Sequence, residues 1–299
     1  MALNIQTFKT RALTALLFVV VMLIGLLWNF WSFLILFTVI HFGCWYEYLK
    51  LIEKIYNTKI DIVIKLFFAI CGFSLMLVLG IQNTSFDIGM KIVGYEVSFK
   101  LLFWLLLLVC LIAFLFQNKH IPTKAKWMSF AGLAYISLSF AALLNLYPTN
   151  DIHTYDTFLI LGNGHIPVLI ICSIWINDTM AYLVGSFIGK TPLSKISPKK
   201  TWEGTIGGFV LCITVAGLVS NFAFFDNSSW AVNLVVMVIA ATCALFGTLG
   251  DLLESKLKRM ADVKDSGSFM PGHGGFLDRF DSLLVAVPAV WILVNFFHK

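Results

Sequence analysis

Two segments of the chain, residues 189–204 and 250–281, combine acidic, basic and glycine residues in patterns suited to binding phosphate groups and a metal ion. In the second segment, four polar residues fall on one helix face if the preceding apolar helix continues past residue 250: Asp251, Glu254, Ser255 and Lys258. Carboxylates and cations would then line one groove. The alternative interpretation is a solvated helix end, held by ion pairs between residues four apart.

A glycine-rich stretch follows at 272–275, with His273 inside it. Glycines permit positive φ and let main-chain N–H groups approach an anion, although a plain turn has the same composition. His273 is a phosphate contact, a general acid or a turn residue. Asp278 and Asp281 stand where a helix should begin. They either stabilise the positive end of its dipole, or one of them joins Asp251 in a two-carboxylate site for Mg2+ and substrate phosphates.

The shorter segment carries two adjacent lysines, Lys199 and Lys200, after a Ser-Pro pair. Flexible ammonium groups suit a polyphosphate, and they equally suit anionic lipid headgroups. Ser197 or Thr201 could cap the helix that follows. The segment therefore indicates an anion site, with a lipid surface as the alternative.

One acidic residue, Asp178, lies inside an apolar run. An ionisable side chain within a membrane span is costly, and it usually faces the protein interior or a polar cavity. We interpret Asp178 as a functional residue, with a hydrogen-bonded clamp between helices as the structural alternative.

The elements that position these residues are membrane helices. Of the 299 residues, 59% are hydrophobic and 12% are charged, about half the ~25% charge of a soluble domain. The 28 Phe residues and the mean hydropathy of +0.89 leave too little polar surface for a soluble, disordered or fibrous chain. The composition predicts an all-α polytopic membrane protein.

Runs long enough to cross a bilayer, roughly 17 to 25 mostly apolar residues, predict about nine transmembrane helices. They are Ala12–Leu27, Trp31–Leu49, Ile62–Ile81, Leu101–Phe116, Trp127–Tyr147, Ile166–Ile188, Thr205–Phe225, Trp230–Leu249 and Ser282–Phe297.

Basic residues predict the orientation of these helices. With the N-terminus in the cytoplasm, all of the 21 Lys and Arg residues except Lys91, Lys100 and Lys299 fall on the cytoplasmic side. The C-terminus is then on the opposite side, and both polar segments face the cytoplasm. The formal charge of +5 thus reflects membrane topology, and we expect no nucleic-acid partner.

The polar segments lie in the C-terminal half of the chain. We therefore predict N-terminal membrane-anchoring helices over residues 1–125, about four spans, and a catalytic membrane region over 126–299, about five spans.

The run from Ser255 to Asp281 resembles the signature of phosphatidate cytidylyltransferases, also called CDP-diacylglycerol synthases. The lead-in from Gly250, the 197–204 segment and the Asp178-x2-Ala181-Tyr182 element resemble that family in order and spacing. The resemblance is good from about residue 170 onward and general before it.

The resemblance implies transfer of CMP from CTP to phosphatidic acid, with release of pyrophosphate. It implies two metal ions, Mg2+ and a second cation, magnesium or another, held by aspartates that match Asp251 and Asp278. It also implies a multi-pass enzyme of the cell inner (cytoplasmic) membrane that acts as a homodimer in the lipid bilayer, with its active site facing the cytoplasm.

Roles of individual residues follow from the same resemblance. The expected catalytic residues are Asp251, Asp278, Lys258 and Arg279. The expected substrate contacts are Ser197, Lys199, Lys200, Thr201, Glu203, Glu254, Ser255, Arg259, Lys264, Asp265, His273, Gly274, Gly275, Asp281 and Asp178.

Two other functions remain open from the sequence. One is a transporter or channel, whose polar residues would concentrate at the bilayer midplane in two related halves. The other is a CTP-using lipid kinase, which would release CDP.

Overall fold

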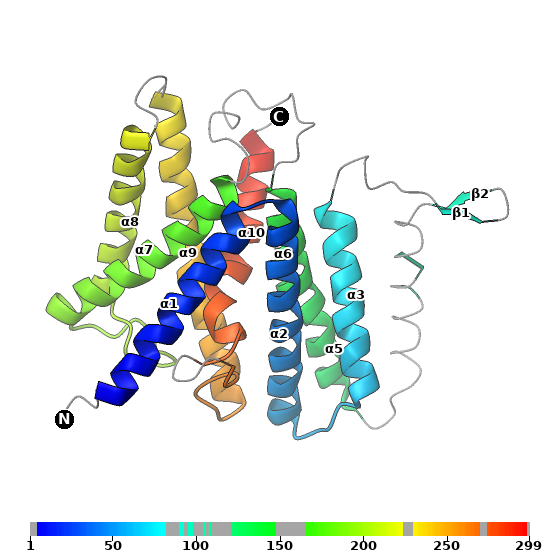
Figure 1. Ribbon diagram of the computed structural model, residues 1–299. Coiled ribbons are helices and arrows are strands. Elements are labelled where there is room, and N and C mark those ends of the chain that lie inside the picture. Colours follow the sequence, from blue (N-terminus) through cyan, green and yellow to red (C-terminus); the bar gives the residue numbers. More distant parts are fainter. Residues whose placement is uncertain are drawn as a thin grey trace. The chain divides into compact units, whose positions relative to one another are not determined.

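The computed structural model describes residues 5–81, 90–92, 95–97, 104–105, 108, 121–147, 165–223, 230–269 and 274–297 (Figure 1). The predicted span Leu101–Phe116 lies almost entirely outside the described residues, and His273 lies outside them as well. Apart from one short hairpin, the described residues of regular structure are helical. The hairpin pairs β1 (Met90–Ile92) with β2 (Tyr95–Val97) in antiparallel register, an addition to the all-α fold expected from the sequence.

The helices are α1 (Ile5–Leu27), α2 (Phe30–Tyr56), α3 (Ile62–Gly80), α5 (Thr123–Gly132), α6 (Leu138–Asn145), α7 (His165–Ile188), α8 (Trp202–Ala223), α9 (Trp230–Met260) and α10 (Leu277–Phe297). A π-helical turn at Leu133–Ser137 joins α5 to α6. Within the described ranges, six helices are long and apolar enough to cross a membrane: α2, α3, the continuous α5–α6, α7, α8 and α9. The protein is thus a multi-pass helical membrane protein, and the count of nine spans stays a prediction.

The chain forms two compact units, each built from separate stretches of sequence. Unit 1 comprises residues 1–145 and 260–279, and unit 2 comprises residues 146–259 and 280–299. The predicted division into an anchoring region and a catalytic region concerns function, and it stays a prediction.

Local signals in the sequence set the ends of α2 in unit 1. Asn29 and Ser32 form a reciprocal capping box, in which the Ser32 amide donates to Asn29 Oδ1 at 2.9 Å and the Asn29 amide donates to Ser32 Oγ at 3.0 Å. The helix ends at Asn57, whose φ of 47° is left-handed.

Aromatic side chains fill the core of unit 1. The Trp45 ring of α2 stacks on Phe68 of α3, with ring centres 5.7 Å apart. Its indole N–H donates to Ser137 Oγ at 2.9 Å, inside the π-helical turn. The apolar face of α2 is thereby fixed against both α3 and the α5–α6 helix.

In unit 2, α7, α8 and α9 pack around small buried side chains. Glycines let α8 approach α7 closely. A Cβ atom at Gly204 would lie 2.6 Å from the Ala181 carbonyl oxygen, and one at Gly208 would lie 2.7 Å from the Ala181 Cβ. The same close approach brings the start of α8, with Thr201 before it, against the end of α7.

Helix α9 is longer than a membrane crossing requires. Its 31 residues give a length of roughly 46 Å, against about 30 Å of bilayer hydrocarbon. The helix continues through Asp251 to Met260, so the condition that places Asp251, Glu254, Ser255 and Lys258 on one helix face is met.

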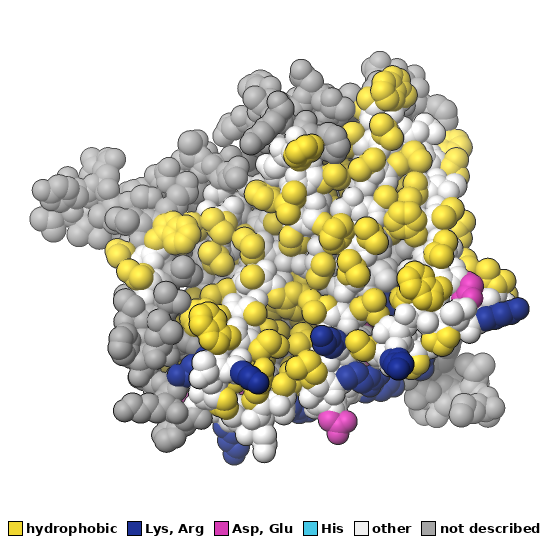
Figure 2. All heavy atoms as spheres, turned by 180° about the vertical axis from the view of Figure 1, so that it is seen from behind, with side chains coloured by type: hydrophobic (Ala, Val, Ile, Leu, Met, Phe, Trp, Pro, Cys, Tyr) yellow, Lys and Arg dark blue, Asp and Glu magenta, His cyan; other side chains and the backbone are white. Residues whose placement is uncertain are grey.

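Hydrophobic side chains cover much of the described surface, as Figure 2 shows. Large examples from unit 2 are Phe187, Phe222 and Trp230, whose exposed fractions are 84%, 67% and 81%. Such a surface is unfavourable in water and suits contact with lipid acyl chains.

Candidate active site

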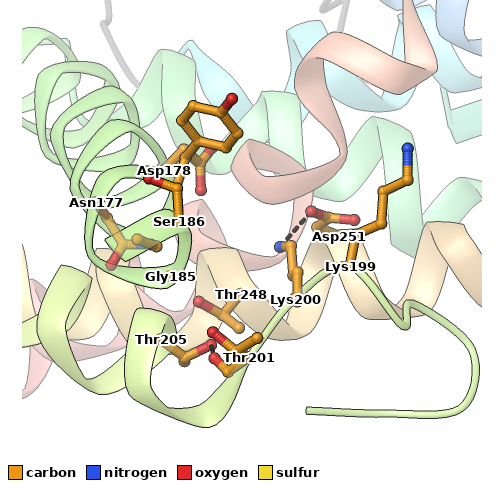
Figure 3. Close-up of a pocket in the computed structure, with 12 residues that line it drawn as sticks. Asn177, Asp178, Gly185, Ser186, Lys199, Lys200, Thr201, Thr205, Thr248 and Asp251 are labelled. Atoms are coloured by element: carbon orange, nitrogen blue, oxygen red, sulfur yellow. Dashed lines mark hydrogen bonds and ion pairs between the residues drawn. The ribbon is translucent and has the colours of Figure 1, made fainter. Parts of the chain in front are cut away.

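A cavity of 410 Å³ lies in unit 2, at the point where α7, the loop 189–201, α8 and α9 meet. Figure 3 shows the side chains around it. Polar side chains around it come from three segments: Asp178 and Ser186 from α7, Lys199, Lys200 and Thr201 from the loop, and Thr248 and Asp251 from α9. The cavity therefore unites Asp178, the 197–204 segment and the 250–255 lead-in, which lie far apart in the sequence.

An ion pair between Lys200 and Asp251 crosses this cavity (Figure 3). Each side chain is 28% exposed, so the pair remains accessible to a ligand. Asp251 Oδ1 also accepts a hydrogen bond from Ser255 Oγ at 3.1 Å. Lys199 is exposed, and its ammonium group points away from the pair in Figure 3. An anion in the cavity could therefore contact Lys200, which is paired with Asp251, and Lys199, which extends away from that pair.

Hydrogen bonds across the 189–201 loop fix where these lysines stand. The Leu193 amide donates to the Lys200 carbonyl at 2.7 Å, and the Trp202 amide donates to the Thr191 carbonyl at 2.9 Å. Glu203 closes the loop, because its carboxylate accepts from the Thr191 hydroxyl at 2.8 Å and from the amides of Thr191 and Lys190.

Thr201 caps α8, because its Oγ1 accepts the Gly204 amide at 3.1 Å. The capping interpretation is therefore confirmed for Thr201, which also lines the cavity. Ser197 contributes its carbonyl oxygen, which accepts the Lys200 amide at 3.1 Å and closes the turn before the two lysines.

The polar side chains at the end of α9 either line the cavity or bond other groups of the protein. Asp251 opens into the cavity, whereas Glu254 is fully buried and forms an ion pair with Lys258 one turn later. Arg259 reaches the loop, where its Nε donates to the Ile196 carbonyl at 3.4 Å. On one helix, Asp251 thus lines the cavity, and one ion pair between residues four apart joins the buried Glu254 to Lys258.

Two further acidic residues of unit 2, Asp178 and Asp281, differ in exposure. Asp178 lines the cavity with an exposed side chain. Asp281, in the first turns of α10, is only 8% exposed, and its Oδ1 accepts the Ser282 amide at 2.7 Å. Burial, together with the negative charge of Asp251, raises the pKa of Asp281 above its usual range.

Asp278 lies in unit 1, where it holds the glycine-rich loop. Its Oδ2 accepts hydrogen bonds from the Gly275 amide at 2.8 Å and from both the amide and the hydroxyl of Ser266 at 2.9 Å. Gly274 has a φ of +86°, so the positive φ expected of this loop is confirmed at one position.

Glu47 of α2 joins this cluster, and the sequence analysis missed it. Its Oε2 accepts the Ser266 hydroxyl at 2.7 Å, and its two oxygens accept the amides of Phe276 and Leu277. The available signal was an acidic residue inside the predicted span Trp31–Leu49, the same signal that drew attention to Asp178.

Three further predicted residues, Lys264, Asp265 and Arg279, have exposed side chains. Their predicted roles in substrate binding and catalysis stay predictions.

The donor chemistry of the unit 2 cavity fits a magnesium ion. Among the described residues, no group of three or more His, Cys, Asp and Glu side chains is arranged as a metal centre. Mg2+ in phosphate-handling sites needs only one or two carboxylates, because waters and substrate phosphates complete its shell. Asp178 and Asp251 supply two carboxylates to the one cavity.

Comparison with known proteins gives relatives that align with about two fifths of this chain. Phosphatidate cytidylyltransferase 5, chloroplastic, of Arabidopsis thaliana is 48% identical over 123 residues, 40% of this chain and 30% of the relative. The phosphatidate cytidylyltransferase of Bacillus subtilis is 44% identical over 125 residues, 42% of this chain and 45% of the relative. The protein of that name from Staphylococcus haemolyticus is 44% identical over 122 residues, 40% of this chain and 45% of the relative.

These alignments therefore span less than half the length of each relative. The model of the cytidylyltransferase family, in contrast, matches residues 9–297, nearly the whole chain. Because this match covers nearly the whole chain, the chain belongs to the cytidylyltransferase family.

Proposed function

We propose that this protein is a phosphatidate cytidylyltransferase, which transfers CMP from CTP to phosphatidic acid and thereby supplies CDP-diacylglycerol for phospholipid biosynthesis. The observation that carries the proposal is the unit 2 cavity, where accessible carboxylates and lysines stand together at the polar ends of membrane helices. Family membership and the names of the relatives support the same reaction.

In this reaction, a phosphate oxygen of phosphatidic acid attacks the α-phosphorus of CTP. A new P–O bond forms, the bond to the β-phosphate bridging oxygen breaks, and pyrophosphate leaves with the electron pair. Lys199 and Lys200 would bind substrate phosphates, with Lys200 exchanging its contact with Asp251 for one with a phosphate. Lys258, Arg259, Lys264 and Arg279 are the further phosphate contacts we propose.

Asp251 and Asp178 are the cavity carboxylates that would hold Mg2+ beside the phosphates. A bound divalent ion would neutralise charge that develops on the phosphate oxygens and on the leaving group. The resemblance pairs Asp251 with Asp278 as metal ligands, so Asp278 as a further ligand and a second cation, magnesium or another, are part of the proposal.

We further propose a homodimer in the inner (cytoplasmic) membrane, with the N-terminus and the active site on the cytoplasmic side and the C-terminus on the opposite side. The distribution of Lys and Arg residues supports this orientation. A cytoplasmic site gives access to CTP, while the acyl chains of phosphatidic acid remain in the inner leaflet.

The test is incubation of the detergent-purified protein with CTP, Mg2+ and several phosphatidic acids, with products identified by mass. We expect CDP-diacylglycerol and pyrophosphate in equal amounts. CTP with label in the β- or γ-phosphate distinguishes the kinase alternative, which would leave free CDP and a phosphorylated lipid. Free CDP without CDP-diacylglycerol would overturn the proposal.

A further inference from the structure

Glu47 is a buried carboxylate in an otherwise apolar helix face. Its side chain is 4% exposed, and its buried neighbours on α2 include Cys44, Trp45 and Tyr48. A buried carboxylate is costly unless donors satisfy it. Among the described residues, three donors between positions 266 and 277 contact Glu47: the Ser266 hydroxyl and the backbone amides of Phe276 and Leu277.

These contacts place Glu47 at the N-terminus of α10, which begins at Leu277. The first amides of a helix have no partner within it, and the helix dipole favours a negative charge there. The Phe276 amide donates to Glu47 Oε1 at 3.0 Å, and the Leu277 amide donates to Oε2 at 2.9 Å. Glu47 therefore caps α10 from a residue 230 positions earlier in the chain.

The backbone around Glu47 is shaped to fit this contact. Cβ atoms at Gly267 or Gly275 would clash with the Glu47 carboxylate. One turn earlier on α2, a Cβ atom at Gly43 would clash with the Phe276 ring. Gly43 and Glu47 thus form a contact surface on α2, against which the residues that precede α10 pack.

Ser266 links Glu47 to Asp278. Its hydroxyl lies 2.7 Å from Glu47 Oε2 and 2.9 Å from Asp278 Oδ2, so its single proton can bond one carboxylate at a time. The Ser266 amide donates to Asp278 Oδ2 at 2.9 Å as well. The orientation of Asp278 therefore depends on a residue that Glu47 holds.

We propose that Glu47 is a positioning residue for the reaction: it holds Ser266 and the start of α10, and through them it orients Asp278. The inference rests on the proposed function, because it assigns Glu47 a role toward a proposed catalytic residue. It also gives α2, which was predicted to be part of a membrane anchor, a second role in holding a proposed catalytic residue of the same unit.

The test compares Glu47→Gln with Glu53→Gln in the full-length protein in detergent. Glu53 is the matched control, because it lies on the same helix but bonds Lys65 and the Ile60 amide, both outside residues 260–279. The amide of Gln is neutral, and its N–H groups would oppose the donors around Glu47. We expect Glu47→Gln to lower kcat by about 10- to 100-fold, as for outer partners of catalytic ligands, and to raise the Mg2+ concentration for half-maximal rate, with KM for phosphatidic acid unchanged.

Hydrogen exchange gives a readout without substrate or metal. In peptides that cover Phe276 and Leu277, we expect exchange about tenfold faster in Glu47→Gln and unchanged in Glu53→Gln, because only the first loses those amide contacts. Unchanged exchange in Glu47→Gln, or faster exchange with wild-type kcat, would overturn the inference. Wild-type protein without cytidylyltransferase activity would overturn the proposed function, and the exchange comparison would still test the contact.

Ser266→Ala keeps the inference testable if Glu47→Gln does not fold. This variant removes only the hydroxyl between the two carboxylates and keeps the amide bond to Asp278. We expect a smaller fall in kcat, about three- to tenfold, since one hydrogen bond of several is lost. Wild-type kcat and wild-type exchange in Ser266→Ala would overturn the proposal.

Discussion

The two polar clusters of this apolar chain use the same residue types in opposite ways. In unit 2, Asp178 and Asp251 face a cavity, and the ion pair between Asp251 and Lys200 is accessible. In unit 1, Glu47 and Asp278 are occupied by backbone amides and the Ser266 hydroxyl. A carboxylate open to a cavity is free to exchange partners with a ligand, whereas one satisfied by the backbone holds the chain in place.

The strongest test of this contrast is Asp251→Asn. We expect loss of Mg2+-dependent CDP-diacylglycerol formation by roughly 10³-fold or more, because several kcal/mol of charge stabilisation would be removed. The thermal unfolding midpoint should stay near that of the wild type, since the partner Lys200 is partly exposed and such pairs contribute about 0–1 kcal/mol. Activity near the wild-type level would contradict the assignment of Asp251 to the metal site.

Asp278→Asn sharpens the contrast, because it should affect both activity and stability. We expect activity to be abolished as for Asp251→Asn, and also a stability loss of about 1.5–3 kcal/mol, since a charged acceptor of backbone N–H groups is neutralised. The measurement is thermal unfolding in detergent beside the activity assay. A variant with lost activity and wild-type stability would show that Asp278 does not hold the loop.

The effect of replacing each lysine of the unit 2 loop on KM for CTP should depend on where that lysine lies in the cavity. We expect Lys200→Ala to raise KM for CTP about tenfold, which corresponds to about 1.4 kcal/mol, and Lys199→Ala to raise it less. The variant with both substitutions should raise KM for CTP more than either single variant. Lys195→Ala is the control, because Lys195 is an exposed lysine of the same loop that does not line the cavity. If KM for CTP were the same in all variants, the alternative that these lysines bind anionic lipid headgroups would be favoured.

Much of the architecture could be predicted from the sequence, because membrane helices are specified by local hydrophobicity. The predicted span Ile62–Ile81 compares with α3 at Ile62–Gly80, and Ile166–Ile188 compares with α7 at His165–Ile188. The polar extension of α9 was likewise visible in its spacing. Short-range chemistry was also predictable, as in the Thr201 cap, whose donor lies three residues away.

Partnerships between distant residues could not be predicted in the same way. Glu47 bonds residues 219 to 230 positions later, and nothing in the local sequence of α2 specifies which segment supplies its donors. For Glu203, the resemblance implied a substrate contact, and the structure adds a set of loop contacts made by the same carboxylate. A sequence motif indicates which residues belong to one site. The exposure of a side chain and the donors around it indicate whether that residue binds substrate or holds the backbone.

Glu203→Gln provides the smallest expected effect and the finest comparison. Glu203 and Glu47 each use one carboxylate to hold backbone amides, but the contacts of Glu203, in the first turn of α8, are exposed to solvent and Glu47 is buried. Water can replace a lost hydrogen bond at an exposed position, whereas a buried donor would remain unsatisfied. We therefore expect Glu203→Gln to raise KM for CTP only about threefold, with kcat unchanged, because the loop that presents Lys200 loosens without unfolding.

Thr191→Val is the matched control for that variant, because it removes the hydroxyl donor to Glu203 and keeps the backbone amide. Its effect on KM should be smaller than that of Glu203→Gln, and proteolytic cleavage within 190–200 should rise in the same order. If Glu203→Gln lowered kcat as strongly as Glu47→Gln, exposure would not be what separates the two carboxylates, and Glu203 would have to contact the reacting phosphates directly. The comparison of these two glutamates thus decides whether the loop lysines are merely held in place by Glu203 or share the reaction with it.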